Sequence, residues 1–293
     1  MILSTTTSIL SRRVGDKNAI EIIKKAGFDA YDISLVSMRD DDHYLNGEDY
    51  IEKAHSIKNF ADSLGLPCNQ AHAPFPSSVG DEEKDAKIFK TIVRSMEIAS
   101  ILGAKIIVVH PKHHLPYQEH IEELYNMNVE FYNSLIPYCK RYNIKVACEN
   151  MWQCNSNTYS IIDSTCSRPW EFNKYIDALN SEWIVGCLDI GHTSLVGTDT
   201  SDFIHSMGNK RLQALHVHDT DFVNDLHTLP FFGKIDYEKV VRALGEIDYQ
   251  GDFTFEAECV FDKIPINALQ PAADLMCSIG RYLTEKIETY KNN

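Results

Sequence analysis

Apolar positions along the chain follow two patterns, and each pattern predicts one type of secondary structure. Short runs that are almost continuously apolar, such as residues 105–109 (KIIVV) and 145–148 (KVAC), are typical of strands in a parallel sheet covered on both faces. Between such runs, apolar residues recur every three or four positions, which predicts amphipathic helices. One such repeat comprises Leu124, Met127, Phe131, Leu135 and Tyr138.

Turn-forming residues mark the junctions between the two patterns. Gly27, Gly65 and Gly103 each follow a helical pattern and precede a β-prone run within a few residues. Asn143 takes the same place in a fourth segment. Because Gly and Asn adopt the left-handed conformation that ends many helices, these positions predict helix C-termini. The chain is therefore expected to alternate between helix and strand.

Eight alternating units predict a single-domain (β/α)8 TIM barrel over residues 1–293, since such barrels have typically ~250 residues or more. An open doubly wound sheet is the competing fold. It usually carries a glycine-rich phosphate loop after its first strand, and residues 4–12 (STTTSILSR) contain no glycine. The predicted strands lie at residues 2–6, 30–34, 67–72, 105–110, 144–149, 184–189, 212–217 and 252–256.

Composition narrows the range of partners. The chain has 28 Lys plus Arg against 42 Asp plus Glu, a formal charge of −14, which disfavours binding to nucleic acid or to acidic membranes. No basic leader precedes a long apolar run, and no stretch reaches the roughly 18 apolar residues of a membrane span. The eight cysteines form no C-x-x-C pair, which fits reduced thiols. A cytoplasmic protein is expected.

The last residues of the predicted strands indicate where the chemistry lies. Active sites of such barrels form at the C-terminal ends of the strands. Six of the eight predicted strands end on a residue type that ligates metals, namely His72, His110, Glu149, Asp189, His216 and Glu256. A single residue of this kind is commonly an ordinary loop residue. Six of them at the same ends of six strands predict a shared site.

A mixture of imidazoles and carboxylates is suited to a divalent cation. This donor set favours Mn²⁺, Mg²⁺, Co²⁺ or Zn²⁺ over soft metals. Without a cation, several carboxylates would repel one another in the low dielectric of a barrel mouth. His216 and His218 lie two residues apart and point to the same side of a strand, so both are candidates at this stage.

Longer motifs resemble the xylose isomerase-like superfamily of sugar phosphate isomerases and epimerases, which also contains endonuclease IV. The resemblance covers the chain from the third strand to the eighth. Its motifs are HAPF (72–75), VVHP (108–111), ACENM (147–151), LDIGHT (188–193), HVHDTD (216–221), DLHTLPFFGKIDY (225–237) and YQGDFTFEAE (249–258).

The resemblance implies a metal site made of Glu149, Asp189, His216 and Glu256. His216 is preferred over His218 because the family histidine ends its strand, and Asp219 is then expected to support it. Glu256 is preferred over Glu258 because it lies five residues after a glycine, as the family glutamate does.

The family chemistry implies a sugar isomerase or epimerase that transfers a proton next to a carbonyl through a metal-stabilised enediolate. Glu149 and Glu256 are the implied acid and base, and Mn²⁺ is the preferred metal. The substrate is expected to be a small carbohydrate and the protein a homodimer or homotetramer. The residues expected to contact substrate are His72, His110, His192 and Trp152, with Phe75 as a further stacking candidate.

Three alternatives to an isomerase or epimerase stay open, and one of them is a barrel without catalytic activity. Asp225 and His227 match the additional ligands of endonuclease IV, an enzyme that cuts DNA at abasic sites with a three-zinc cluster, although the same pair occurs in sugar-isomerase-like relatives. The charge of −14 and the motif ENMWQCNS (149–156) argue against DNA. A metal-dependent lyase acting on 3-keto glycosides would use the same ligands.

Two predictions concern loops. Residues 152–170 form a long polar segment without helical period, which predicts an irregular lid over the site. Phosphate specificity stays undecided, with Lys112, Arg168 and Lys234 as candidate anion contacts.

Overall fold

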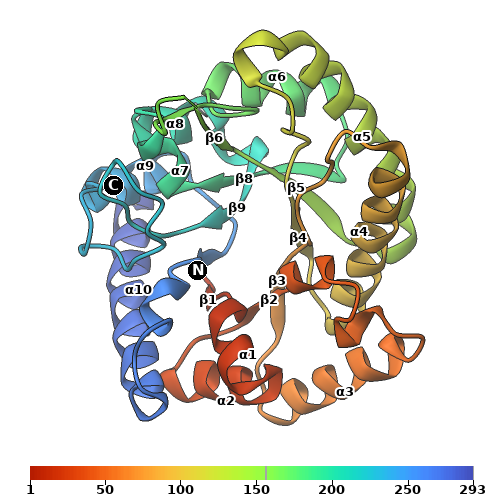
Figure 1. The fold of residues 1–293 in the computed structure, drawn as a ribbon. Coiled ribbons are helices and arrows are strands. Elements are labelled where there is room, and N and C mark those ends of the chain that lie inside the picture. The colour runs from red at the N-terminus through yellow and green to blue at the C-terminus, as the bar shows by residue number, and fades with distance from the viewer. Residues whose placement is uncertain (156, 293) are drawn as a thin grey trace.

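The computed structural model describes residues 1–155 and 157–292, and it confirms the predicted barrel. Figure 1 shows the strands at the centre with helices around them. The barrel strands are β1 (Leu3–Thr5), β2 (Tyr31–Ser34), β3 (Cys68–His72), β4 (Ile106–Val109), β5 (Lys145–Glu149), β8 (Ile184–Asp189), β9 (Leu212–His216) and β10 (Phe253–Phe255).

Parallel pairing closes these strands into a ring. Strands β2, β3, β4, β5, β8 and β9 form one sheet in that order, and β1 pairs with β10. Single bridges join the two parts, from Thr6 to Asp32 on one side and from Val217 to Phe255 on the other. Because every strand thereby has two neighbours, the open-sheet alternative does not apply.

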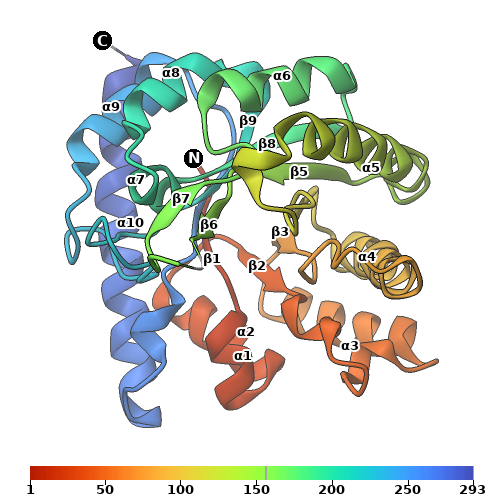
Figure 2. The same cartoon turned by 45° about the horizontal axis from the view of Figure 1, so that its top comes forward.

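The helices pack around the outside of the ring (Figures 1 and 2). They are α1 (Ser8–Val14), α2 (Asp16–Ala26), α3 (Tyr50–Ser63), α4 (Glu82–Leu102), α5 (Ile121–Tyr142), α6 (Pro169–Leu179), α7 (Ile190–Leu195), α8 (Thr200–Arg211), α9 (Tyr237–Glu246) and α10 (Leu269–Lys291). Short 3-10 turns are η1 (Val36–Arg39), η2 (Tyr44–Asn46), η3 (Tyr117–Glu119), η4 (Glu258–Phe261) and η5 (Ile266–Ala268). None of the helices in the described ranges combines the length and apolarity needed to cross a bilayer.

The predicted helix ends agree with the backbone. Gly27, Gly103 and Asn143 are left-handed C-caps, with φ of 96°, 101° and 50°. Gly65 is also left-handed, at φ 62°, but it follows the C-cap Leu64 by one residue. These turns return the chain from each helix to the start of the next strand.

The inner face of the barrel explains where the strand-end residues point. Val108, Ala147, Cys187 and Ala214 pack together as a small buried cluster inside the ring. Strand side chains alternate between faces with a period of two. The residues two positions further on must therefore also point inward, and these are His110, Glu149, Asp189 and His216.

The segment after β5 is more regular than predicted. Instead of an irregular loop over 152–170, it contains a two-stranded antiparallel hairpin, β6 (Trp152–Cys154) and β7 (Ile161–Asp163), and α6 already begins at Pro169. Residue 156 lies outside the described residues. A β-strand is indicated in a sequence by alternating apolar and polar side chains. Strands β6 and β7 have only three residues each, which is too short for this alternation to be recognised. Figure 2 shows this hairpin beside the barrel strands.

Candidate functional site

Four side chains that end neighbouring strands converge inside the barrel mouth. One potential ligand atom from each of Glu149, Asp189, His216 and Glu256 lies within 4.8 Å of the others. His216 Nδ1 is 3.2 Å from Glu149 Oε1 and 3.3 Å from Glu256 Oε2. The first three are buried, and the side chain of Glu256 is 14% exposed toward a cavity. The geometry therefore offers a group of three carboxylates and one imidazole, which we call the central group.

The two alternative ligands of the sequence analysis fall in different places. His218 is not in the central group; its Nε2 lies 3.0 Å and 3.1 Å from the two oxygens of Asp189. Glu258 is also outside the central group, and its Oε2 lies 3.6 Å from His227 Nδ1. The structure thus brings His216 and Glu256, rather than His218 and Glu258, to the position implied for the ligands.

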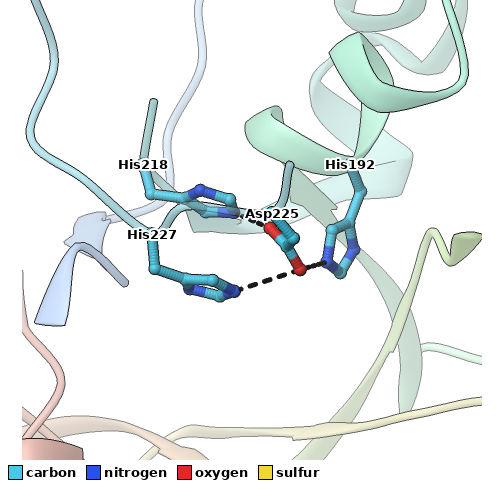
Figure 3. A group of neighbouring side chains, drawn as sticks. All are labelled: His192, His218, Asp225 and His227. Atoms are coloured by element: carbon cyan, nitrogen blue, oxygen red, sulfur yellow. Dashed lines mark ion pairs between the residues drawn. The ribbon is translucent and has the colours of Figure 1, made fainter. Parts of the chain in front are cut away.

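A second group, shown in Figure 3, lies beside the first. The Asp225 carboxylate stands between three imidazoles, with Nε2 distances of 3.3 Å to His227, 3.5 Å to His192 and 3.9 Å to His218. The rings of His218 and His227 stack in parallel, 4.0 Å apart. We call His192, His218, Asp225 and His227 the lateral group.

A third group shares Glu149 with the first. His110 Nε2 is 3.2 Å and His72 Nε2 is 3.7 Å from Glu149 Oε2, whereas Glu149 Oε1 faces His216. Glu149 is therefore placed to bridge two adjoining sites through its two oxygens. His72 and His110 also line the cavity, so the geometry is compatible both with the substrate contact expected of them and with ligation.

Backbone hydrogen bonds set the orientation of three imidazoles. Nδ1 of His72, His192 and His227 lies 2.8 Å, 2.8 Å and 2.9 Å from the carbonyl oxygens of Ala73, Asn150 and Glu256. A carbonyl can only accept, so each Nδ1 carries the proton and donates it. When the ring is neutral, Nε2 then has a free lone pair, and it faces Glu149 in the case of His72 and Asp225 in the case of His192 and His227. This arrangement is usual for histidines that ligate metals.

Several buried polar atoms of these groups lack a hydrogen-bond partner within the described part of the chain. They are Glu149 Oε2, His216 Nε2, His110 Nδ1, His218 Nδ1 and Asp225 Oδ1. Buried polar atoms without partners are rare in proteins and costly. A cation would satisfy the oxygens and would offset the repulsion between carboxylates, so the donor set fits a divalent metal.

The two glutamates of the central group differ in their electrostatic environment. Burial raises the pKa of Glu256 to about 8. Burial also acts to raise the pKa of Glu149, but the positive charges of His216 and His110 outweigh it, and that pKa lies well below its ordinary value. In the protein without a bound ion, one carboxyl therefore holds its proton at neutral pH and the other does not.

Asp219 has a different role from the one expected. Its carboxylate does not contact His216. It accepts hydrogen bonds of 2.8–3.1 Å from four backbone N–H groups, which belong to Thr220, Phe231, Gly233 and Ile235. These bonds hold the loop that presents Asp225 and His227 to the lateral group.

A cavity of about 930 Å³ opens above the central group. Both predicted aromatic residues line it: Phe75 stacks on His110 with ring centroids 4.5 Å apart, and Trp152 Nε1 donates to Asp225 Oδ2 at 3.1 Å. His113 also lines the cavity, and burial lowers its pKa to about 4. The sequence analysis missed His113 because it lies in a loop, where no periodicity indicates direction.

The three candidate phosphate contacts do not line this cavity. Arg168 pairs with Asp163 on β7 at 2.7 Å. The ammonium group of Lys112 lies over the ring of Phe131, 5.4 Å from its centroid, and Lys234 lines a separate cavity beside α8 and α9. Arg12 and Arg39 line the main cavity instead.

Solved structures share this fold across nearly the whole chain. A D-tagatose 3-epimerase-like protein has a TM-score of 0.73 and 20% identity, covering 98% of this chain and 100% of its own. The 3-keto-D-glucoside 4-epimerase YcjR from E. coli has a TM-score of 0.72 and 17% identity, covering 95% and 99%. The IOLI protein, solved with a bound zinc atom, has a TM-score of 0.71 and 18% identity, covering 99% of each chain.

Sequence relatives and a family model place the chain in one family. The uncharacterized protein MJ1311 of Methanocaldococcus jannaschii is 26% identical over 201 residues, 66% of this chain and 65% of the relative. The uncharacterized protein y4fM of Sinorhizobium fredii is 25% identical over 167 residues, 55% and 50%. The match thus spans less than two thirds of either relative. The family model of the xylose isomerase-like TIM barrel matches residues 20–276, and the chain belongs to that family.

Proposed function

We propose that the protein is a sugar isomerase or epimerase that depends on a divalent metal and moves a proton next to a carbonyl group. The observation that carries this proposal is the pair Glu149 and Glu256, held in one buried group at the base of a cavity. The proteins of similar fold include a D-tagatose 3-epimerase-like protein, a D-psicose 3-epimerase and a 3-keto-D-glucoside 4-epimerase, and these names support the choice of a carbohydrate substrate.

The central group would hold the metal through Glu149, Asp189, His216 and Glu256. Oxygen and imidazole donors suit Mn²⁺, which we prefer, and also Zn²⁺, Co²⁺ or Mg²⁺. When bound, the cation supplies positive charge that stabilises the oxygen of a carbonyl as it gains negative charge.

The carboxyl groups supply the proton transfer. The environments of Glu149 and Glu256 push their pKa values apart, which is the usual arrangement when one carboxyl acts as base and the other as acid. His72, His110 and His192 surround Glu149 and would hold the hydroxyl groups of the substrate. The indole of Trp152 would stack on the sugar ring of the substrate. The hairpin β6–β7 that carries Trp152 would act as the lid.

A second candidate function is an endonuclease IV-like phosphodiesterase with several zinc ions. The lateral group and the group of His72, His110 and Glu149 favour more than one metal. The charge around the cavity argues against DNA, because acidic side chains outnumber Arg12 and Arg39 among its lining residues. We therefore propose a second cation in the lateral group, held by Asp225 and His227 with His218, without a nucleic acid substrate.

Glu256→Gln tests the acid–base pair. In D₂O with Mn²⁺, the wild type is expected to exchange solvent deuterium into one sugar of a panel comprising D-tagatose, D-psicose, D-fructose and 3-keto-D-glucosides. The variant removes the titrating group and is expected to lose about 100-fold or more of this exchange. Glu258→Gln, two residues away and outside the central group, is the matched control and should lose less than about tenfold. Undiminished exchange in a metal-loaded Glu256→Gln protein would contradict the assignment.

Elemental analysis tests the lateral site. Wild-type protein loaded with Zn²⁺ and freed of excess metal is expected to hold more than one ion per chain. Asp225→Asn is expected to hold about one ion less, because it removes the carboxylate at the centre of three imidazoles. His205→Ala, an exposed histidine on α8, is the control and should match the wild type. An Asp225→Asn protein that holds as many ions as the wild type would refute the second cation.

Proton release on metal binding tests the electrostatics of the central group. Since the pKa of Glu256 is about 8 without a metal, and a ligating carboxyl must be ionised, binding of Mn²⁺ at pH 7 should release about one proton from this side chain. Calorimetric titrations in two buffers with different ionisation enthalpies measure the number released. Glu256→Gln should release fewer protons than the wild type, and an equal number in both proteins would be inconsistent with a protonated Glu256.

A further inference from the structure

The cavity continues well beyond the central group. Its far part is lined by the segments that follow β1 and β2, which comprise α1, the start of α2 and the short turns η1 and η2. The whole cavity measures about 930 Å³, near the upper end of the roughly 300–1,000 Å³ of pockets that enclose drug-sized ligands. A single hexose is smaller than such ligands. The central group and one sugar ring therefore account for only part of the space.

The far part of the cavity, which we call the distal half, carries side chains suited to hydroxyl groups. It includes two guanidinium donors, two carboxylate acceptors and several serines, and its formal charge is zero. A sugar hydroxyl both donates and accepts a hydrogen bond, so it matches this mixture. A formal charge of zero gives a phosphate dianion no net attraction. The side chains that carry this argument are Ser11, Arg12, Asp16, Ser37, Arg39 and Asp40.

Contacts between the segments after β1 and β2 hold the wall of the distal half in place. The Tyr44 hydroxyl, from the loop after β2, donates to the Asp16 carboxylate at the start of α2. The Arg39 guanidinium lies over the ring of Phe75, 5.9 Å from its centroid. Arg12 is exposed to the cavity, and no ion-pair partner is found for it among the described residues. Its donors are therefore free for a ligand.

One continuous wall joins the distal half to the central group. Arg39 lies over Phe75, Phe75 stacks on His110 at 4.5 Å, and His110 Nε2 lies 3.2 Å from Glu149. A ligand that reaches the central group with one end can therefore contact Arg39 with the other.

We infer that the substrate is a glycoside of at least two sugar units. The reacting ring lies at the central group, and an uncharged second ring lies in the distal half against Arg12, Asp16, Arg39 and Asp40. This inference deepens the proposed function and rests on it for the identity of the reacting ring. It assigns specificity to the segments after β1 and β2, which do not carry any residue of the central group.

Calorimetry on the Mn²⁺-loaded protein tests the distal half without requiring turnover. Glucose is compared with three glucosyl-glucose disaccharides of different linkage, namely cellobiose, maltose and trehalose, none of which carries a ketone. At least one disaccharide is expected to bind about tenfold more tightly than glucose. In Arg12→Ala and Arg39→Ala, the ratio of the two affinities should fall toward one. Arg141→Ala, an exposed arginine on α5, is the control and should keep the wild-type ratio.

The inference would be overturned by equal affinity for glucose and all three disaccharides, or by an unchanged affinity ratio in both arginine variants. Tight binding of inorganic phosphate that is lost in Arg39→Ala would also overturn it, because the distal half would then be an anion site. Deuterium exchange into the keto sugars tests the proposed function separately. Exchange without a disaccharide preference refutes only the second subsite, and a disaccharide preference without any exchange refutes only the proton transfer.

Discussion

The site depends on the strict alternation of side chains along closed parallel strands. Val108, Ala147, Cys187 and Ala214 fill the interior, and the residue two positions after each one must enter the same space. Those residues are polar and ionisable, so the ring brings charged groups together where water is largely excluded. Burying several carboxylates is unfavourable unless opposite charge compensates it. The fold thus creates a need for positive charge at the same point where it places metal-ligating side chains.

Two features of the chain supply the remaining organisation. The carbonyl groups of Ala73, Asn150 and Glu256 fix three histidine rings so that Nε2 faces the carboxylates. Asp219 gathers four backbone N–H groups and shapes the loop that brings Asp225 to the lateral group. Neither feature ligates a metal. Both reduce the conformational freedom of groups that would, which is how a surrounding structure preorganises a site.

Periodic segments were readable from the sequence, and loops were not. The eight strands and the convergence of Glu149 with His216 follow from apolar runs and their last residues, because strand geometry relates sequence spacing to direction. The predicted strands do not place Arg12, Arg39 or His113, which reach the cavity from α1, from the short turn η1 and from the loop after β4. They do not place Arg168 either, which was a candidate anion contact, although in the fold it pairs with Asp163 on β7.

The central claim is that side chains from four separate strands share one divalent cation. The direct measurement is anomalous scattering from crystals grown with excess Mn²⁺, recorded on both sides of the manganese absorption edge. The account predicts a manganese peak within about 2.0–2.3 Å of ligand atoms from Glu149, Asp189, His216 and Glu256. Manganese found only at exposed surface carboxylates, with those four side chains arranged as they are here, would contradict it.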